Sequence, residues 1–483
     1  MKVGVSTIEF YVRNVRTRLP FKYGKAVLTS TPILHVRMEV HDGEGHSSVG
    51  YSADCLPPKW FDKDPEKDFK RNVEDLLLAA NCGMKSYLEV GKEPTFFFDL
   101  WLKGYSKTIE RSGTHLLNGL TGSFGSSLME RALLDGFSKL QGTHLFDSLK
   151  KRALRIQPER VHSRLNNWNF SDSLPETPLG QIAVRQTVGL ADPIRDSDIP
   201  KEEALNDGLS QSIEAWARDF GIRYFKIKVT NDLSVDIPRL LAIAQTLDAV
   251  APSDYKISLD GNETFKSVDQ LEKWNRKVHA EDDLKGLLER VLYIEQPIDR
   301  LSAFDASVAS HLKEAKDLPP VIIDESDDSL GTFNMAADYG YRGVSFKNCK
   351  GAIKGLLNKM LVDSLNVSGE REFFLTGEDL MNTSVVPVQQ DLAMASILGL
   401  SHVERNGHHY CHGLDHLSKN EIDDCIARHP NLYEPFGESG RLKIQDGFLD
   451  VSSLHTQGFG SVMEPDFDFM TPLGEWRFED LEG

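Results

Sequence analysis

Cysteines are scarce in this 483-residue sequence, and they do not cluster. Their number is odd and they include no Cys-x-x-Cys pair; they are Cys55, Cys82, Cys349, Cys411 and Cys425. Such a set fits neither a disulfide framework nor a zinc knuckle. We therefore expect the protein to work in a reducing compartment, the cytoplasm.

Long apolar runs are also missing. No window approaches the roughly 20 apolar residues that a membrane-spanning helix needs. Residues 1–20 likewise contain no apolar core of signal-peptide length. We expect a soluble protein that does not have a membrane as its partner.

Basic residues are outnumbered by acidic ones. The sequence has 55 Lys and Arg against 73 Asp and Glu, which gives a net charge of −18. Nucleic acids attract clustered positive charge, so we do not expect one as a partner. With 40% hydrophobic residues, the chain can still bury a core large enough for two or three domains.

The first part of the chain predicts an α+β domain over residues 1–175. Its first 55 residues alternate apolar and polar positions around the turn sequence "DGEG", which is typical of a small antiparallel sheet. Two stretches with helical spacing follow, at 67–84 and 125–142. The polar, proline-bearing segment 169–181 is interpreted as a linker.

A repeating pattern then predicts a (β/α)8 barrel, the TIM barrel, over residues 176–430. Eight short apolar runs begin near positions 182, 224, 255, 290, 320, 343, 372 and 400. Each run is followed by residues able to form a helix, and the whole pattern has about the length of such a barrel. The remaining segment, 431–483, contains a predicted strand pair at 440–451 and is expected to pack back on the first domain.

Charged residues end five successive runs of the predicted barrel. In "YFKIKV" the strand period of two places Lys226 and Lys228 on one face. The next four runs end in Asp260, Glu295, Asp324 and Lys347. Because the carboxyl ends of the strands form the mouth of such a barrel, these six side chains are expected to surround one pocket.

The predicted ring of charges indicates a metal-dependent reaction. Three converging carboxylates repel one another unless a cation lies between them, and Mg²⁺, or Mn²⁺, prefers such oxygen ligands. A metal there would bind a substrate carboxylate and stabilise the enediolate formed when the neighbouring carbon loses a proton. Lys228 and Lys347 would face opposite sides of that carbon. Lys226 would lower the proton affinity of Lys228.

With these residues the sequence resembles the enolase superfamily, specifically its muconate lactonizing enzyme-like branch in the mandelate racemase/muconate lactonizing enzyme family. The matching motifs are "KIK" (Lys226, Lys228), "LDGN" (Asp260), "IEQP" (Glu295), "IDES" (Asp324) and "FKNCKG" (Lys347). The resemblance implies that Lys228, Lys347 and Lys226 are catalytic and that the three carboxylates hold Mg²⁺. Asn262 and Lys350 are expected beside the metal ligands.

The same resemblance implies that residues 1–175 form a capping domain that covers the barrel mouth. Its loops 18–25 and 51–61 would select a small-molecule carboxylate substrate. Tyr23, Tyr51, Glu378 and His408 are the candidate substrate contacts. A homo-oligomer is expected from the family alone.

The predicted activity is that of a racemase, epimerase or cycloisomerase. A dehydratase acting on an acid sugar is the alternative that shares the first step. A metal-free glycoside hydrolase and a catalytically silent barrel scaffold are alternatives of other classes. The segment "HVERNGHHY" lacks the Asp-x-Asp of dipeptide epimerases, which weakens an assignment to dipeptides.

Three local alternatives stay open on spacing alone. Glu325 competes with Asp324 as a metal ligand, and Lys350 with Lys347 as the sixth-strand lysine; the resemblance selects Asp324 and Lys347. The cluster of His408, His409, Cys411 and His412 invites a zinc site. Its spacing fits no structural zinc pattern, so it is interpreted as a polar loop.

Overall fold

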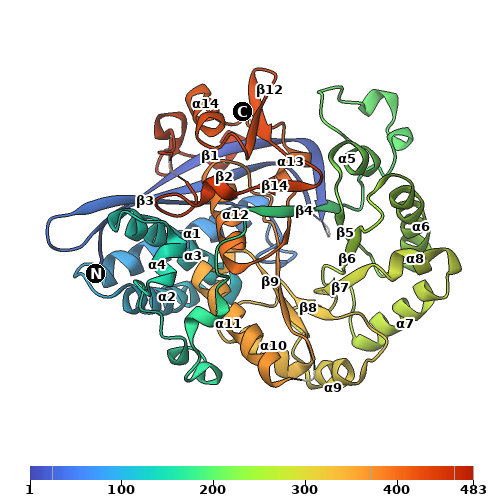
Figure 1. Cartoon of the computed structure of the whole chain (residues 1–483), viewed down its shortest axis with the longest axis horizontal. Helices are drawn as coiled ribbons and strands as arrows, with labels where there is room; N and C mark the ends of the chain where they lie inside the picture. The colour runs from blue at the N-terminus through green and yellow to red at the C-terminus, as the bar shows by residue number, and fades with distance from the viewer. Residues whose placement is uncertain (24–25, 370, 462, 482–483) are drawn as a thin grey trace.

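The computed structural model describes residues 1–23, 26–369, 371–461 and 463–481. A closed barrel lies beside an antiparallel sheet covered by helices (Figure 1). This arrangement confirms the predicted TIM barrel with an N-terminal α+β domain. The domain boundaries at 175 and 430 stay a prediction.

The N-terminal domain consists of one sheet and four helices. Its long strands β1 (Gly4–Tyr23), β2 (Ala26–His41) and β3 (Ser47–Cys55) are antiparallel neighbours. The helices are α1 (Phe69–Val90), α2 (Phe97–Thr114), α3 (Gly119–Leu140) and α4 (Leu145–Lys150). Helix α3 lies so close to β3 that a Cβ atom on Gly50 would be 2.0 Å from the Ala132 carbonyl oxygen. Only glycine fits at this contact.

The barrel is formed by eight parallel strands, and β11 pairs with β4 to close it. All eight predicted runs form these strands. They are β4 (Gln181–Val188), β5 (Tyr224–Lys228), β6 (Lys256–Asp260), β7 (Val291–Glu295), β8 (Val321–Ile323), β9 (Gly343–Phe346), β10 (Phe374–Gly377) and β11 (His402–Glu404).

Helices follow the strands and form the outer layer of the barrel (Figure 1). They are α5 (Ile213–Phe220), α6 (Leu233–Val250), α7 (Val268–His279), α8 (Lys285–Leu288), α9 (Ala306–Glu314), α10 (Thr332–Tyr339), α11 (Ala352–Ser368) and α12 (Val386–Leu398). The short helix α13 (Gly407–Tyr410) instead contacts β1, and α14 (Lys419–Arg428) packs beside the strand pair of residues 433–442. The strands are buried on both faces, which explains their nearly continuous apolar sequences.

Both strands of the pair predicted at 440–451 form, but each pairs mainly with a strand outside this segment, apart from an isolated bridge between Gln445 and Phe448. Strand β13 (Ser439–Leu442) pairs with β12 (Tyr433–Phe436), whereas β14 (Phe448–Asp450) pairs with the start of β4. The reason is that the start of β4 has an unpaired edge on the side of β5. Strand β5 pairs with β4 only from Arg185 onwards, so the first residues of β4 are available to pair with β14.

The end of the chain returns to the N-terminal sheet. Strand β15 (Thr471–Pro472) pairs antiparallel with β1, and the Trp476 indole donates a hydrogen bond to Asn14. The red end of the chain therefore lies next to the blue strands in Figure 1. The barrel and the sheet are thus joined by the first linker and also through this segment.

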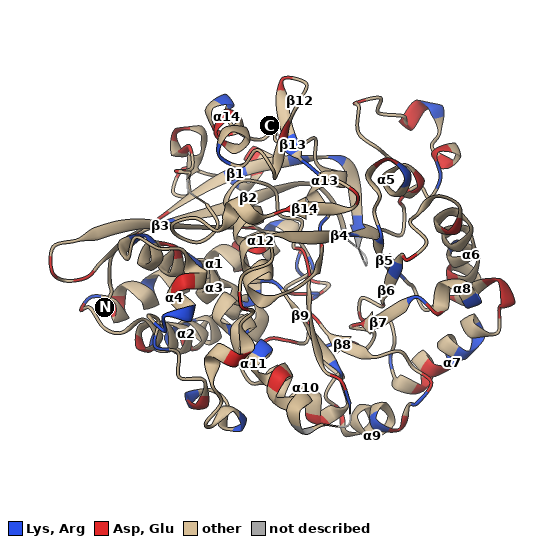
Figure 2. Ribbon diagram, in the orientation of Figure 1, with Lys and Arg blue, Asp and Glu red and all other residues tan. Residues whose placement is uncertain are grey.

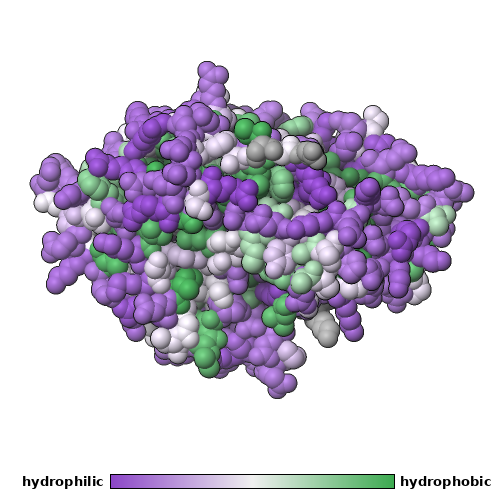
Figure 3. Space-filling view, turned by 90° about the horizontal axis from the view of Figure 1, so that it is seen from below, coloured by the Kyte–Doolittle hydropathy of each residue, from purple (hydrophilic) through white to green (hydrophobic). Residues whose placement is uncertain are grey.

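The face of the molecule that Figure 3 presents is mainly hydrophilic. On the face that Figure 3 presents, hydrophobic residues are interspersed among charged and polar ones. Among the described residues, no helix has the length and apolarity to cross a membrane.

Candidate functional site

A small cavity lies between the mouth of the barrel and the N-terminal domain. Its volume is about 40 Å³. The barrel contributes Lys226, Lys228, Asp260, Asn262, Asp324 and Lys347, and the N-terminal domain contributes Phe21, Leu28, Pro57 and Trp60. Five of the six charged strand-end residues predicted from the sequence therefore line one cavity. The sixth, Glu295, is buried and contacts Lys226.

Lys226 lies at the centre of four carboxylates. Its ammonium group donates hydrogen bonds to Glu295 Oε1 at 2.8 Å, Glu378 Oε2 at 3.0 Å and Glu404 Oε2 at 3.2 Å. Asp260 Oδ2 is 3.1 Å away. Strands β7, β10, β11 and β6 thus each place one carboxylate around a single lysine.

These contacts keep Lys226 charged. Burial alone would lower its pKa, but the charges of Glu295, Glu378, Glu404 and Asp260 raise it well above the ordinary value. In this arrangement four carboxylates balance the charge of Lys226. Its expected effect on the proton affinity of Lys228 stays a prediction.

Lys228 and Asp260 form a second contact at the cavity wall. Lys228 donates a hydrogen bond of 2.6 Å to Asp260 Oδ2, and the backbone N–H of Asn262 donates to Oδ1. Burial would raise the pKa of Asp260, but the charges of Lys228 and Lys226 lower it below the ordinary value. Asn262 Nδ2 also reaches Glu325 Oε1 at 3.5 Å. Its expected place beside the metal ligands stays a prediction.

Asp324 binds two lysines from the sixth-strand segment. Lys347 donates to Oδ2 at 2.8 Å, while Lys350 reaches Oδ1 at 3.2 Å. Ser345 also donates to Asp324. Of the two lysines, only Lys347 lines the cavity, and the charge of Asp324 raises its pKa although burial opposes this. Lys350 lies behind Asp324 and also donates to Ser345.

The three carboxylates Asp260, Glu295 and Asp324 suit a hard divalent cation by their chemistry. All donors are oxygens, and Glu295 Oε2 is buried without a hydrogen-bond partner. The pKa of Glu295 is raised well above its ordinary value, because the carboxyl is buried and faces the charge of Glu378. A cation at this oxygen would reverse that effect.

The carboxylates are turned towards lysines in this arrangement. Across the described parts of the chain, no three His, Cys, Asp or Glu side chains surround a common point in the manner of metal ligands. The reason is that Asp260 faces Lys228 and Lys226, and Asp324 faces Lys347. A bound cation would therefore compete with ammonium groups for the same oxygens.

A buried layer below the cavity contains residues that the sequence analysis missed. Arg185 on β4 is fully buried and donates to Glu378, to the Gly377 carbonyl and to Thr376. Glu378 therefore joins Arg185 to Lys226 and does not line the cavity. Arg185 could have been identified from the sequence, since it is a charged residue inside the apolar run "IAVRQTV".

Glu404 was also missed. It ends the eighth strand, lines the cavity, and accepts hydrogen bonds from Lys226, Thr187 and Asn406. Its position at a strand end was the same signal that identified Asp260. The family resemblance instead concerned the segment "HVERNGHHY", where dipeptide epimerases have Asp-x-Asp.

The N-terminal domain reaches the site through Trp60. The Lys347 ammonium lies 4.1 Å from the centre of the Trp60 ring, which is a cation–π distance. Tyr51, a predicted substrate contact, instead donates to Glu464 of the C-terminal segment. Tyr23 is the last residue of β1. Its side chain lies outside the described residues, as do positions 24–25 of the predicted loop 18–25.

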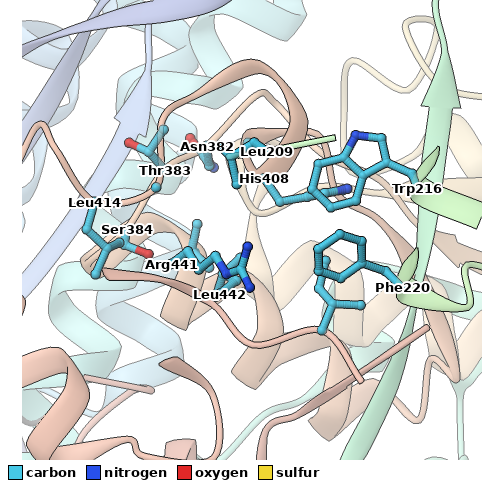
Figure 4. A pocket seen from close by; sticks show the side chains of 14 residues that line it. Leu209, Trp216, Phe220, Asn382, Thr383, Ser384, His408, Leu414, Arg441 and Leu442 are labelled. Atoms are coloured by element: carbon cyan, nitrogen blue, oxygen red, sulfur yellow. The ribbon is translucent and has the colours of Figure 1, made fainter. Parts of the chain in front are cut away.

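His408 lines a different, narrow cavity of about 30 Å³. Figure 4 shows it beside Trp216, with which it makes an edge-on contact. In the same cluster, His409 accepts a hydrogen bond from the Trp216 indole at 2.8 Å, and His412 pairs with Asp415. The imidazoles thus have separate structural surroundings. The segment is not a polar loop as interpreted from the sequence, since residues Gly407–Tyr410 form the short helix α13 and both His409 and Cys411 are buried.

Comparisons with known proteins identify solved structures that have the same fold. No protein-family model matches the sequence, and no curated protein matches it. Among solved structures, an enolase from Bradyrhizobium complexed with magnesium and mandelic acid is similar, with a TM-score of 0.59. The alignment has 13% identity and covers 97% of this chain and 98% of that chain. The two chains share one fold.

Two further structures give the same result. An N-succinyl Arg/Lys racemase from Bacillus cereus has a TM-score of 0.59 at 15% identity, with 97% of both chains covered. A 2-chloromuconate cycloisomerase from Rhodococcus opacus has a TM-score of 0.59 at 15% identity, covering 96% of this chain and 98% of that chain. Because one fold serves many reactions, the function has to be argued from the site.

Proposed function

We propose that the protein is a Mg²⁺-dependent enzyme of the enolase superfamily that removes a proton next to a substrate carboxylate. A racemase, epimerase or cycloisomerase is the favoured outcome, and a dehydratase shares the first step. The observation that carries the proposal is that Lys228 and Lys347 line one cavity, each hydrogen-bonded to a different acidic residue. The magnesium complex among structures of this fold supports it.

Asp260, Glu295 and Asp324 are the side chains that would hold the metal. When bound, Mg²⁺ would supply positive charge for the substrate carboxylate and for the charge that develops as the proton leaves. The partnerless Glu295 Oε2 supports this choice of ligands. Lys226, fixed by Glu378 and Glu404 as well, would keep the acidic groups in place.

Lys228 and Lys347 are the proposed proton carriers. A lysine takes a proton only in its neutral form, so the ion pair that stabilises its ammonium has to weaken first. Asp324 now raises the pKa of Lys347. Once Asp324 has another cationic partner, this stabilisation falls, and Lys347 can exchange a proton with the substrate carbon.

The upper wall of the cavity indicates the character of the substrate. Phe21, Leu28, Trp60, Leu380 and Met381 line it, so the part of the substrate that points away from the carboxylate should be apolar. The present volume of about 40 Å³ is much smaller than the 300 Å³ or more of typical ligand pockets. The loops that cover the barrel therefore have to open to admit a substrate.

The proposal is tested by exchange of substrate α-hydrogens with deuterated solvent. Libraries of N-acyl amino acids, dipeptides and acid sugars would be incubated with Mg²⁺, and the exchange followed by mass spectrometry. Exchange that disappears with EDTA and returns with Mg²⁺ is expected. Glycoside hydrolysis that persists in EDTA, with no exchange of any α-hydrogen, would contradict the proposal. A cytoplasmic homo-oligomer is part of the proposal and is checked by fractionation and light scattering.

A further inference from the structure

A second cavity lies in the last part of the predicted N-terminal domain, close to the linker at 169–181. Its volume is about 570 Å³, and no residue that lines it also lines the cavity of Lys228 and Lys347. Its walls come from the segment 149–170, which follows α4 and contains short 3-10 helices. The cavity has the size of typical small-molecule sites.

This segment has a charge opposite to that of the whole chain. Between residues 150 and 164 there are six Lys and Arg and one acidic residue, whereas the complete sequence carries a net charge of −18. Figure 2 shows blue, basic positions next to α4. A local excess of positive charge in an acidic protein indicates a surface that attracts anions.

Arg152 and Arg155 line the cavity, and both are held by neutral groups. Arg152 donates to the side-chain oxygens of Asn169 and Ser171. The Arg155 guanidinium lies 3.8 Å from the centre of the Phe96 ring. Across the part of the chain that the structure describes, neither arginine forms an ion pair with a carboxylate. Both side chains are exposed, so their guanidinium groups are open to a ligand from solution.

The backbone conformation of these two arginines is unusual. Arg152 and Arg155 have φ values of 54° and 52°, in the left-handed region that non-glycine residues rarely adopt. Such conformations cost free energy and are found preferentially at ligand sites. Here they occur at both arginines of the cavity.

We propose that this cavity binds a soluble organic phosphate monoester. Two guanidinium groups match a dianionic phosphate in charge and offer paired N–H donors to its oxygens. The apolar part of the ligand would lie against Leu154, Ile156 and Phe170. Glu159, the acidic residue of the lining, opposes the phosphate and limits its affinity.

The test is calorimetric titration of the full-length protein with phenyl phosphate in buffer without Mg²⁺. Binding is expected at pH 7.5 and should weaken at pH 5, because the second pKa of a phosphate monoester is about 6. The variants Arg152→Asn and Arg155→Asn should each lose at least about tenfold in affinity. Asparagine tolerates the left-handed backbone, so these variants should remain folded.

Two further variants make the test specific. Glu159→Gln should bind phenyl phosphate more tightly, since it removes the opposing charge. Arg164→Gln is the matched control, because Arg164 belongs to the same basic segment but pairs with Asp338 and does not line the cavity. Equal affinity in wild type and Arg155→Asn, absence of binding at pH 7.5, or binding only to vesicles containing phosphatidic acid would overturn the proposal. These results do not depend on the proposed activity, which uses other residues.

Discussion

The Lys347 ammonium group lies 4.1 Å from the centre of the Trp60 ring, so the N-terminal domain touches a lysine of the barrel mouth. An aromatic face attracts a cation by about 0.5–2 kcal/mol, depending on its burial. Trp60 therefore helps to fix where Lys347 points. Through this contact the N-terminal domain takes part in the site at the barrel mouth.

Replacing Trp60 tests this contact. Trp60→Phe keeps an aromatic face, and we expect its rate of α-hydrogen exchange to stay within about threefold of wild type. Trp60→Leu removes the face and should lose about tenfold, because a displaced ammonium meets the substrate carbon less often. Both variants leave space at a buried position, so the unfolding free energies should be similar. Equal exchange rates in the two variants would show that the ring has no such role.

The buried pair of Arg185 and Glu378 should be important for stability. Arg185→Met leaves Glu378 buried with less compensating charge, which typically costs about 3–5 kcal/mol. The exposed Arg218, which pairs with Asp219, serves as the control, and Arg218→Gln should change stability by less than about 1 kcal/mol. Urea unfolding of both variants gives the comparison. Similar losses in both would mean that the layer below the cavity is not held by this charge pair.

Metal binding should depend on Glu295. Glu295→Gln should weaken Mg²⁺ binding by more than about 100-fold, because changing even an outer partner of a metal ligand typically costs 10–100-fold. Without metal, its unfolding free energy should change little, since the raised pKa of Glu295 already favours the neutral carboxyl that glutamine imitates. Calorimetric titration with MgCl₂ and urea unfolding measure the two effects.

Glu325→Gln is the matched control for this experiment. Glu325 follows Asp324 directly, but its carboxylate reaches Asn262 and lies 4.0 Å from Lys63. Its replacement should leave Mg²⁺ binding nearly unchanged. Loss of binding in Glu325→Gln together with retention in Glu295→Gln would reverse the assignment of ligands.

Stability should fall in acid partly through His409. Burial and the nearby charge of Arg18 lower the pKa of His409 to about 3, whereas it is about 6.5 in an unfolded chain. Between pH 6.5 and about 3, His409 is protonated in the unfolded state but stays neutral in the folded state. The neutral imidazole therefore stabilises the fold at high pH, and this contribution declines as the pH falls from 6.5 towards 3. By pH 5 the loss is about 2 kcal/mol.

A variant isolates this effect from the other titrating groups. His409→Gln can still accept the hydrogen bond of Trp216 but does not titrate. Its unfolding free energy should fall by about 2 kcal/mol less than that of wild type between pH 8 and pH 5. Parallel pH profiles for the two proteins would contradict the predicted pKa shift.

The barrel was predictable from the sequence because each strand is a short apolar run followed by residues able to form a helix, and five successive runs end in a charged residue. This rule found Lys228, Asp260 and Lys347, which the structure brings to one cavity. It depends on local pattern only. Pairing partners are set by which sheet edge is open. The two strands predicted at 440–451 therefore form, as do the eight barrel strands, but they pair mainly with strands outside that segment.

Contacts between distant segments could not be derived in the same way. Trp60 lies in a loop without periodicity, and nothing in its neighbours predicts that it faces Lys347. Tyr51 was expected at the substrate but bonds to Glu464, more than 400 positions later in the chain. Arg185 and Glu404 were both visible in the sequence as charged residues of apolar barrel strands. Arg185 lies within its strand, and Glu404 ends its strand.

The most direct test of the central claim uses the variants Lys228→Ala and Lys347→Ala. With a substrate identified by the exchange screen, each stereoisomer would be incubated in deuterated solvent with Mg²⁺, and α-hydrogen exchange would be measured. Because the two lysines are proposed to face opposite sides of the substrate carbon, each variant should lose exchange of the stereoisomer whose hydrogen points to the missing lysine. Undiminished exchange of both stereoisomers in both variants would contradict the account.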